Sequence, residues 1–186
     1  MVIGPDSSYI LDIDNDGGSN LKITNMPLAP GYVLLWVEGF GPENGSVITT
    51  FHLDEAQALN QGQLIAAGRT FISYGTFTYA PHMAMATPFG AGGDWANVTN
   101  KYLGVRFRTG NQLHYGWARL SVRVNSSTIT AHLTGYAYES TANTPIHAGQ
   151  RMEGTEAPAS EGAANHRSLG SLARGAAQSA KMPILN

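Results

Sequence analysis

Apolar and polar residues alternate most clearly in Leu103-Gly104-Val105-Arg106-Phe107-Arg108, where the apolar side chains fall on one face of an extended strand. The turn residues Thr109-Gly110-Asn111-Gln112 follow, and a longer alternating run then extends from Leu113 to Val124. A second turn, Asn125-Ser126-Ser127, precedes a third alternating run from Thr128 to Tyr138. Residues 103–138 therefore predict a three-stranded antiparallel meander.

The region before this meander has the same β character. Val33–Val37 is a continuous apolar run, whereas Ser46–Phe51 and Thr70–Tyr74 alternate. Charged residues make up only 13% of the chain, against about 25% in ordinary soluble domains. Pattern and composition predict an all-β fold, an antiparallel β-sandwich of jelly-roll-like type. One short helix is expected over Leu53–Leu59, with Asp54 as its N-cap.

The composition of the chain changes near Gly149. Residues 1–149 form the predicted sandwich domain, and residues 150–186 form a low-complexity tail rich in glycine, alanine and serine. Within the tail, residues 168–180 have the spacing of a weakly amphipathic helix, which would be marginal in water on its own. We expect its apolar side chains to dock on a neighbouring subunit, which makes them the predicted assembly residues: Leu169, Leu172 and Ala176.

Charge and composition exclude several classes of protein. The net charge is −2 and no basic cluster occurs, so the chain carries no electrostatic signature of nucleic-acid binding. Cysteine is absent, which excludes disulfides and thiolate metal sites. No stretch approaches 18 consecutive apolar residues, so no membrane span is predicted.

An acidic segment near the N-terminus reads Asp12-Ile13-Asp14-Asn15-Asp16-Gly17-Gly18-Ser19-Asn20. Carboxylates at alternate positions followed by glycine allow a loop to wrap a hard cation with oxygen ligands. The twelfth position, which is glutamate in an EF-hand, is Ile23 here, so the loop is not an EF-hand. The alternative is an acidic turn that joins two strands without a metal. The predicted ion is calcium, and the candidate metal-site residues are Asp12, Asp14, Asp16, Gly18 and Asn20.

No catalytic motif emerges from the sequence. The six histidines are scattered singly, without metal-ligand spacing. Nucleophile elbows, phosphate loops and dinucleotide fingerprints are missing from the sequence. We therefore predict that the chain is not an enzyme.

Aromatic residues concentrate in Tyr115-Gly116-Trp117 and Tyr136-Ala137-Tyr138. If they were exposed on a sheet, such rings would stack on sugars in a carbohydrate-binding module. The alternative is that they form cross-strand pairs in the core, which their place in the best-patterned strands favours. The candidate glycan contacts are Tyr115, Trp117, Tyr136 and Tyr138.

Several of these blocks resemble a known family. The blocks His114-Tyr115-Gly116-Trp117 and Ala137-Tyr138-Glu139, with the flanking strands and Pro145–Gly149, resemble the exported bacterial β-domain of the PEP-CTERM sorting-signal type. The resemblance covers about residues 9–149. It implies export, an extracellular or cell-surface location and no known catalytic residue.

The tail departs from that family. Its members end in Pro-Glu-Pro, an apolar helix and an arginine cluster. Here Glu156-Ala157-Pro158 stands in that place, serine and arginine interrupt the apolar segment, and no basic cluster follows. The sorting segment is therefore degenerate.

Two functions are compatible with these observations. The first is an extracellular structural protein, a subunit that assembles with copies of itself into a filament or surface layer. The second is a calcium-dependent carbohydrate-binding module of the cell surface, with a surface glycan as partner. The first is favoured because low charge, polar β composition and a docking tail all fit it.

Overall fold

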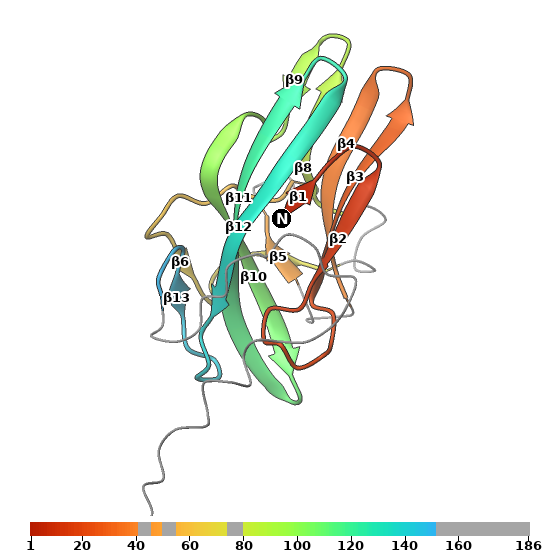
Figure 1. The fold of residues 1–186 in the computed structure, drawn as a ribbon. Coiled ribbons are helices and arrows are strands. Elements are labelled where there is room, and N and C mark those ends of the chain that lie inside the picture. The colour runs from red at the N-terminus through yellow and green to blue at the C-terminus, as the bar shows by residue number, and fades with distance from the viewer. Residues whose placement is uncertain (41–45, 50–54, 74–79, 152–186) are drawn as a thin grey trace, which may run out of the picture.

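The computed structural model describes residues 1–40, 46–49, 55–73 and 80–151, and these residues form an all-β sandwich (Figure 1). A six-stranded sheet has the order β1-β12-β11-β10-β5-β7, and a five-stranded sheet has the order β2-β3-β4-β8-β9. A small two-stranded sheet pairs β13 with β6. All strand pairs in these sheets are antiparallel, which confirms the predicted fold class.

The bounds of the strands are as follows. The six-stranded sheet contains β1 (Val2–Ile3), β12 (Thr128–Tyr138), β11 (Gln112–Asn125), β10 (Val98–Thr109), β5 (Ser46–Ile48) and β7 (Phe71–Ile72). The five-stranded sheet contains β2 (Ser7–Leu11), β3 (Leu21–Ala29), β4 (Tyr32–Gly39), β8 (His82–Thr87) and β9 (Gly90–Gly92). The two-stranded sheet consists of β6 (Leu64–Ile65) and β13 (Ile146–His147).

The predicted meander is present as β10, β11 and β12. Two-residue turns join these strands, because Thr109 pairs with Gln112 and Asn125 pairs with Thr128. All three strands have apolar side chains that face the five-stranded sheet, and these side chains pack with those of that sheet in the main core. Its largest contributors from the two sheets include Phe107, Leu103, Leu120, Leu133, Leu21, Ile23 and Leu35.

A second core lies on the opposite face of the six-stranded sheet. Tyr115 and Trp117 of β11 are covered there by the two-stranded sheet and its flanking segments. The Trp117 ring meets Tyr102 edge-on, with 5.2 Å between the ring centroids. The Trp117 indole N–H also donates to the carbonyl of Gln150 at 3.0 Å. The end of the described chain is therefore fastened to a central strand of the sheet.

The strand order differs from a jelly roll. A jelly roll combines two Greek keys, in which a fourth strand returns over a long connection to lie beside the first. Here β2, β3 and β4 are consecutive neighbours in one sheet, and β10, β11 and β12 are consecutive neighbours in the other. Short turns favour pairing of consecutive strands, so each sheet is built around a meander.

The predicted helix is wrong for the part of it that the structure describes, residues 55–59. Ala56 and Leu59 are buried, and their backbone N–H groups donate to strand carbonyls, at 2.8 Å to His82 and at 2.9 Å to Tyr102. The three-residue spacing of the apolar positions fits a helix as well, but these neighbouring strands supply the hydrogen bonds instead. Leu53 and Asp54 lie outside the described residues.

A buried amide joins the two main sheets. The Asn25 side chain on β3 donates to the carbonyl of Gly4 at 2.8 Å and to that of Ile129, on β12, at 2.7 Å. Asn25 is fully buried, so these bonds form where water cannot compete. The contact fixes one sheet against the other.

The described residues include no helix long and apolar enough to cross a membrane. The predicted tail helix, with Leu169, Leu172 and Ala176, lies outside the described residues.

Candidate metal centre

The acidic segment forms the loop between β2 and β3. The loop closes at its base because the N–H of Asn20 donates to the carbonyl of Leu11 at 3.0 Å. Figure 1 shows it at the same end of the sandwich as the turn between β10 and β11. The Thr109 hydroxyl in β10 donates to Asp14 Oδ2, which ties the loop to the other sheet.

Three carboxylates converge in this loop. Asp12, Asp14 and Asp16 each offer one oxygen, and these oxygens all lie within 4.8 Å of one another. Calcium binds oxygen ligands at about 2.3–2.6 Å, so ligands around one ion are separated by up to about 5 Å. Asp12 and Asp14 are half-buried, and Asp16 is exposed. The three residues can hold a metal ion.

The backbone of the loop makes this convergence feasible. Asn15 and Gly17 adopt left-handed conformations, with φ of 56° and 91°. The N–H of Gly17 donates to Asp12 Oδ2 at 3.0 Å, and the N–H of Gly18 donates to Asp16 Oδ1 at 2.7 Å. A Cβ at position 18 would lie 2.8 Å from that same oxygen, so a side chain there would displace the Asp16 carboxylate.

Asn20 has a structural role at the base of the loop. Its side chain is buried, and its Oδ1 accepts the N–H of Ile13 at 2.5 Å. That oxygen helps to hold the loop closed. The carboxylates that converge are those of the three aspartates.

The carboxylates are only partly compensated by hydrogen bonds. Asp12 Oδ1 and Asp14 Oδ1 are buried and have no hydrogen-bond partner among the described residues. Burial raises the pKa of Asp14; Asp12 and Asp16 raise this pKa further, whereas the hydrogen bond from Thr109 opposes the shift. The N–H groups of Gly17 and Gly18 satisfy one oxygen of Asp12 and one of Asp16. Among the described residues no donor reaches Asp12 Oδ1 or Asp14 Oδ1. A proton or a cation would neutralise the remaining charge.

The structure does not place the predicted glycan contacts on a surface. Tyr115 and Trp117 are only 2% and 1% exposed, so neither ring offers a face to a sugar. Tyr136 and Tyr138 are half-buried and pack against the main core. The Tyr138 ring meets Phe107 edge-on, with 5.5 Å between the centroids. These aromatic residues are thus core pairs.

Sequence analysis missed an apolar surface on the outer face of the five-stranded sheet. Met26, Leu34 and Met85 are paired across β3, β4 and β8 and form one row on this face. Met26 and Met85 are 39% and 41% exposed. Leu28, Tyr32 and Phe89 add apolar surface at the adjoining hairpin turns, and Phe89 is 92% exposed. We call these six residues the apolar face.

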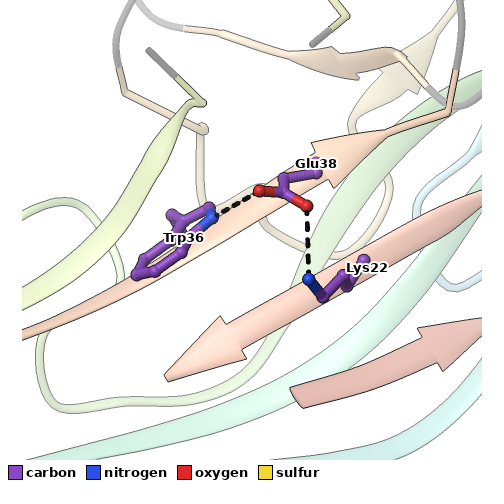
Figure 2. A network of polar contacts seen from close by, with 3 residues as sticks. All are labelled: Lys22, Trp36 and Glu38. Carbon is purple, nitrogen blue, oxygen red and sulfur yellow. Dashed lines mark hydrogen bonds and ion pairs between the residues drawn. The ribbon is translucent and has the colours of Figure 1, made fainter. Parts of the chain in front are cut away.

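A polar network borders the apolar face. Figure 2 shows Glu38 between its two partners on β3 and β4. The Trp36 indole N–H donates to Glu38 Oε1 at 3.0 Å, and Lys22 Nζ lies 3.7 Å from Glu38 Oε2.

The sequence signal for the apolar face was the continuous run Val33–Val37, because a strand with apolar residues at every position is apolar on both faces.

Comparison of the chain with protein families, curated proteins and solved structures finds no match.

Proposed function

We propose that this chain is an exported, non-catalytic structural subunit of the cell surface that assembles with copies of itself through the apolar face. The observation that carries the proposal is the row Met26–Leu34–Met85, which lies in register across three strands and has no covering layer among the described residues. Contiguous exposed apolar surface on a soluble protein is typical of an interaction site. The resemblance of residues 9–149 to exported β-domains supports the location.

A second copy of this chain is the occupant that fits the apolar face best. One amine and one carboxylate, Lys22 and Glu38, border the face and already lie near each other (Figure 2). Such a surface is neutral and offers both members of an ion pair, so it is self-complementary under two-fold rotation. A net charge of −2 also generates little repulsion between copies.

The size of the face determines how strong this contact is. The outer side of the whole five-stranded sheet, with strands about 4.8 Å apart and about six residues long, covers roughly 400 Å², and the apolar face is only part of it. A stable interface buries about 800 Å² on each partner. The apolar face alone therefore supports a weak pair.

A second contact is needed for a polymer, because two-fold pairing closes after two copies. Residues 152–186 follow directly on the anchored segment at Gln150, and they contain the predicted assembly residues Leu169, Leu172 and Ala176. We assign the second contact to this tail.

Calcium is the ion that we propose for the loop at Asp12–Asn20. Carboxylate oxygens suit a hard cation, and the raised pKa of Asp14 marks a charge that binding would relieve. In this role calcium rigidifies the loop, and through the Thr109 contact it fastens one sheet to the other.

Sedimentation velocity over a range of concentrations tests the assembly. The full chain should form species larger than a dimer, and the fragment 1–151 should stop at a weak dimer. Met85→Lys in the full chain should disrupt the face contact, because it places a charge in the apolar row. Gln61→Lys is the matched control, since it adds the same charge at an exposed turn outside the face.

A full chain that remains monomeric at all concentrations would contradict the proposal. So would a Met85→Lys variant that assembles as the unchanged protein does. Circular dichroism of each variant shows whether the sandwich is intact.

A further inference from the structure

A polar hollow lies on the outer face of the six-stranded sheet. It has a volume of about 500 Å³, within the range of about 300–1,000 Å³ that is typical of small-molecule sites. On β11, Tyr115 and Trp117 of this face are covered by the two-stranded sheet, whereas Ser121 and Arg123 lie further along and line the hollow. The other lining residues come from β11, from β12, from the start of β10 and from the residue before it: Val122, Thr130, His132, Val98, Thr99 and Asn97.

Two irregularities in the sheet shape this hollow. The pairing of β10 with β11 shifts between Val98 and Lys101, and that of β11 with β12 shifts between Arg119 and Leu120. Asn97 directly precedes the first shift and Asn100 lies within it, and both adopt left-handed conformations, with φ of 57° and 51°. Asparagine tolerates this conformation better than most residues. Bulges of this kind bend a strand and redirect its side chains.

Hydrogen bonds hold the walls of the hollow in place. Asn97 Oδ1 accepts the N–H of Val124 at 2.8 Å. Ser121 Oγ accepts the N–H of Asn100 at 3.0 Å, which leaves its own hydroxyl proton to donate. The polar groups are thus positioned before a ligand arrives, which lowers the entropic cost of binding.

The chemistry of the lining selects for an anion that also carries hydroxyl groups. Arg123 is exposed, and its guanidinium has no partner in the part of the chain that the structure describes. None of the eight lining residues is a carboxylate, and His132 adds a second nitrogen base. The hydroxyls of Thr99, Ser121 and Thr130 can donate to and accept from sugar hydroxyls.

We infer that this hollow binds an anionic saccharide, with Arg123 on the acidic group and the hydroxyl side chains on the ring. The guanidinium presents a planar fork that matches carboxylate or sulfate oxygens. The side chains of Val98 and Val122 pack in the main core, so the polar side chains form the exposed lining. The lining contains no phenylalanine, tyrosine or tryptophan ring on which a nucleobase would stack. This site is independent of the apolar face, because it lies on the other sheet.

Affinity electrophoresis of the full chain tests the inference with four polymers. Polygalacturonate carries carboxylates, dextran sulfate carries sulfates, dextran is a neutral saccharide, and poly-glutamate is a polyanion without sugar. We expect retardation by at least one anionic polysaccharide, at least tenfold weaker retardation by poly-glutamate, and none by dextran. The polymer with the stronger effect identifies the acidic group.

Two substitutions show whether the hollow is responsible. Arg123→Gln should weaken binding about tenfold or more, as expected for the loss of a charge-assisted hydrogen bond. Arg108→Gln makes the same charge change at an exposed position near the β10–β11 turn and should leave binding unchanged. Thr130→Val, which keeps the shape of the side chain, should weaken binding several-fold. Equal melting temperatures would exclude misfolding as the cause.

Several outcomes would overturn the inference. These are a failure of all four polymers to bind, equal retardation by dextran, equal retardation by poly-glutamate, or unchanged binding by Arg123→Gln. Sedimentation of Arg123→Gln should match that of the unchanged protein, so a failure here is distinguishable from a failure of the proposed assembly.

Discussion

Addition of calcium should stabilise the folded protein through the loop at Asp12–Asn20. Asp12, Asp14 and Asp16 bring three carboxylate oxygens within 4.8 Å, and the structure supplies no donor in the described residues for Asp12 Oδ1 or Asp14 Oδ1. In the unfolded chain these groups are separated and hydrated. Calcium therefore binds the folded state preferentially and shifts the unfolding equilibrium.

The size of this effect follows from the ligand set. Extracellular calcium modules have dissociation constants of about 10⁻⁴–10⁻³ M. Because the Asn20 oxygen is engaged with Ile13, we take the weak end of this range. At about 10 mM calcium the stabilisation is then about 1.4 kcal/mol. For a domain of this size that corresponds to a rise of roughly 3–6 °C in Tm.

Asp14→Asn separates metal binding from ordinary loop stability. An asparagine side chain keeps an oxygen that accepts the Thr109 hydroxyl, but it removes the buried charge. The metal-free variant should therefore be at least as stable as the unchanged protein, while its calcium response should disappear. Asp6→Asn is the matched control, since Asp6 is an exposed aspartate outside the cluster. It should retain the full shift.

Differential scanning fluorimetry with calcium, magnesium and a chelator measures these shifts. An Asp14→Asn variant that still gains 3–6 °C with calcium would refute the reasoning, because the shift would then originate elsewhere. A large loss of stability in the metal-free variant would refute the claim that the Asp14 charge is unfavourable.

Three further outcomes are expected. Because the pKa of Asp14 is raised, the folded state holds the Asp14 proton more tightly than the unfolded state does. The stability gained from this proton is present at low pH and is lost as the pH rises through the raised pKa. The calcium-dependent rise in Tm should accordingly be smaller at about pH 4.5 than at neutral pH, and an equal rise would contradict this. Asn25→Ala should lower the free energy of unfolding by about 2–4 kcal/mol in urea titrations, because the carbonyls of Gly4 and Ile129 lose a buried donor. A loss below about 1 kcal/mol would show that this hydrogen-bonded contact between the sheets contributes little. Trp117→Phe should cost about 1–3 kcal/mol, since it removes the bond to Gln150 and part of the packing on Tyr102, and unchanged urea unfolding would argue against an anchoring role.

Local pattern was sufficient for the central part of the fold. The meander at residues 103–138 was predictable because each strand pairs with its neighbour in sequence over a two-residue turn. The strand order of the whole sandwich was not, because it depends on which distant strands pair. The segment at residues 55–59 illustrates the same limit: its apolar spacing fits a helix, but its backbone bonds with β10 and with the start of β8.

The candidate sites were predictable to a smaller extent. The convergence of the three aspartates follows from their alternate spacing and the glycines after them. The role of Asn20 does not, because it depends on where the N–H of Ile13 points after the loop closes. The sequence could not separate buried aromatic rings such as Trp117 from exposed ones. It also gave no sign of the hollow at Arg123, which depends on register shifts between strands.

The fastening of Gln150 to Trp117 bears on how such a protein would carry mechanical load. If neighbouring copies hold residues 152–186, tension along the assembly enters each domain at this point. The indole N–H and the close approach of Gly149 to the Tyr102 ring transmit that force into β11 and β10. Both strands lie inside the six-stranded sheet and are hydrogen-bonded on both sides. Under tension the domain would therefore be held by its most extensively hydrogen-bonded strands. The two-residue pairing of β13 with β6 would separate first.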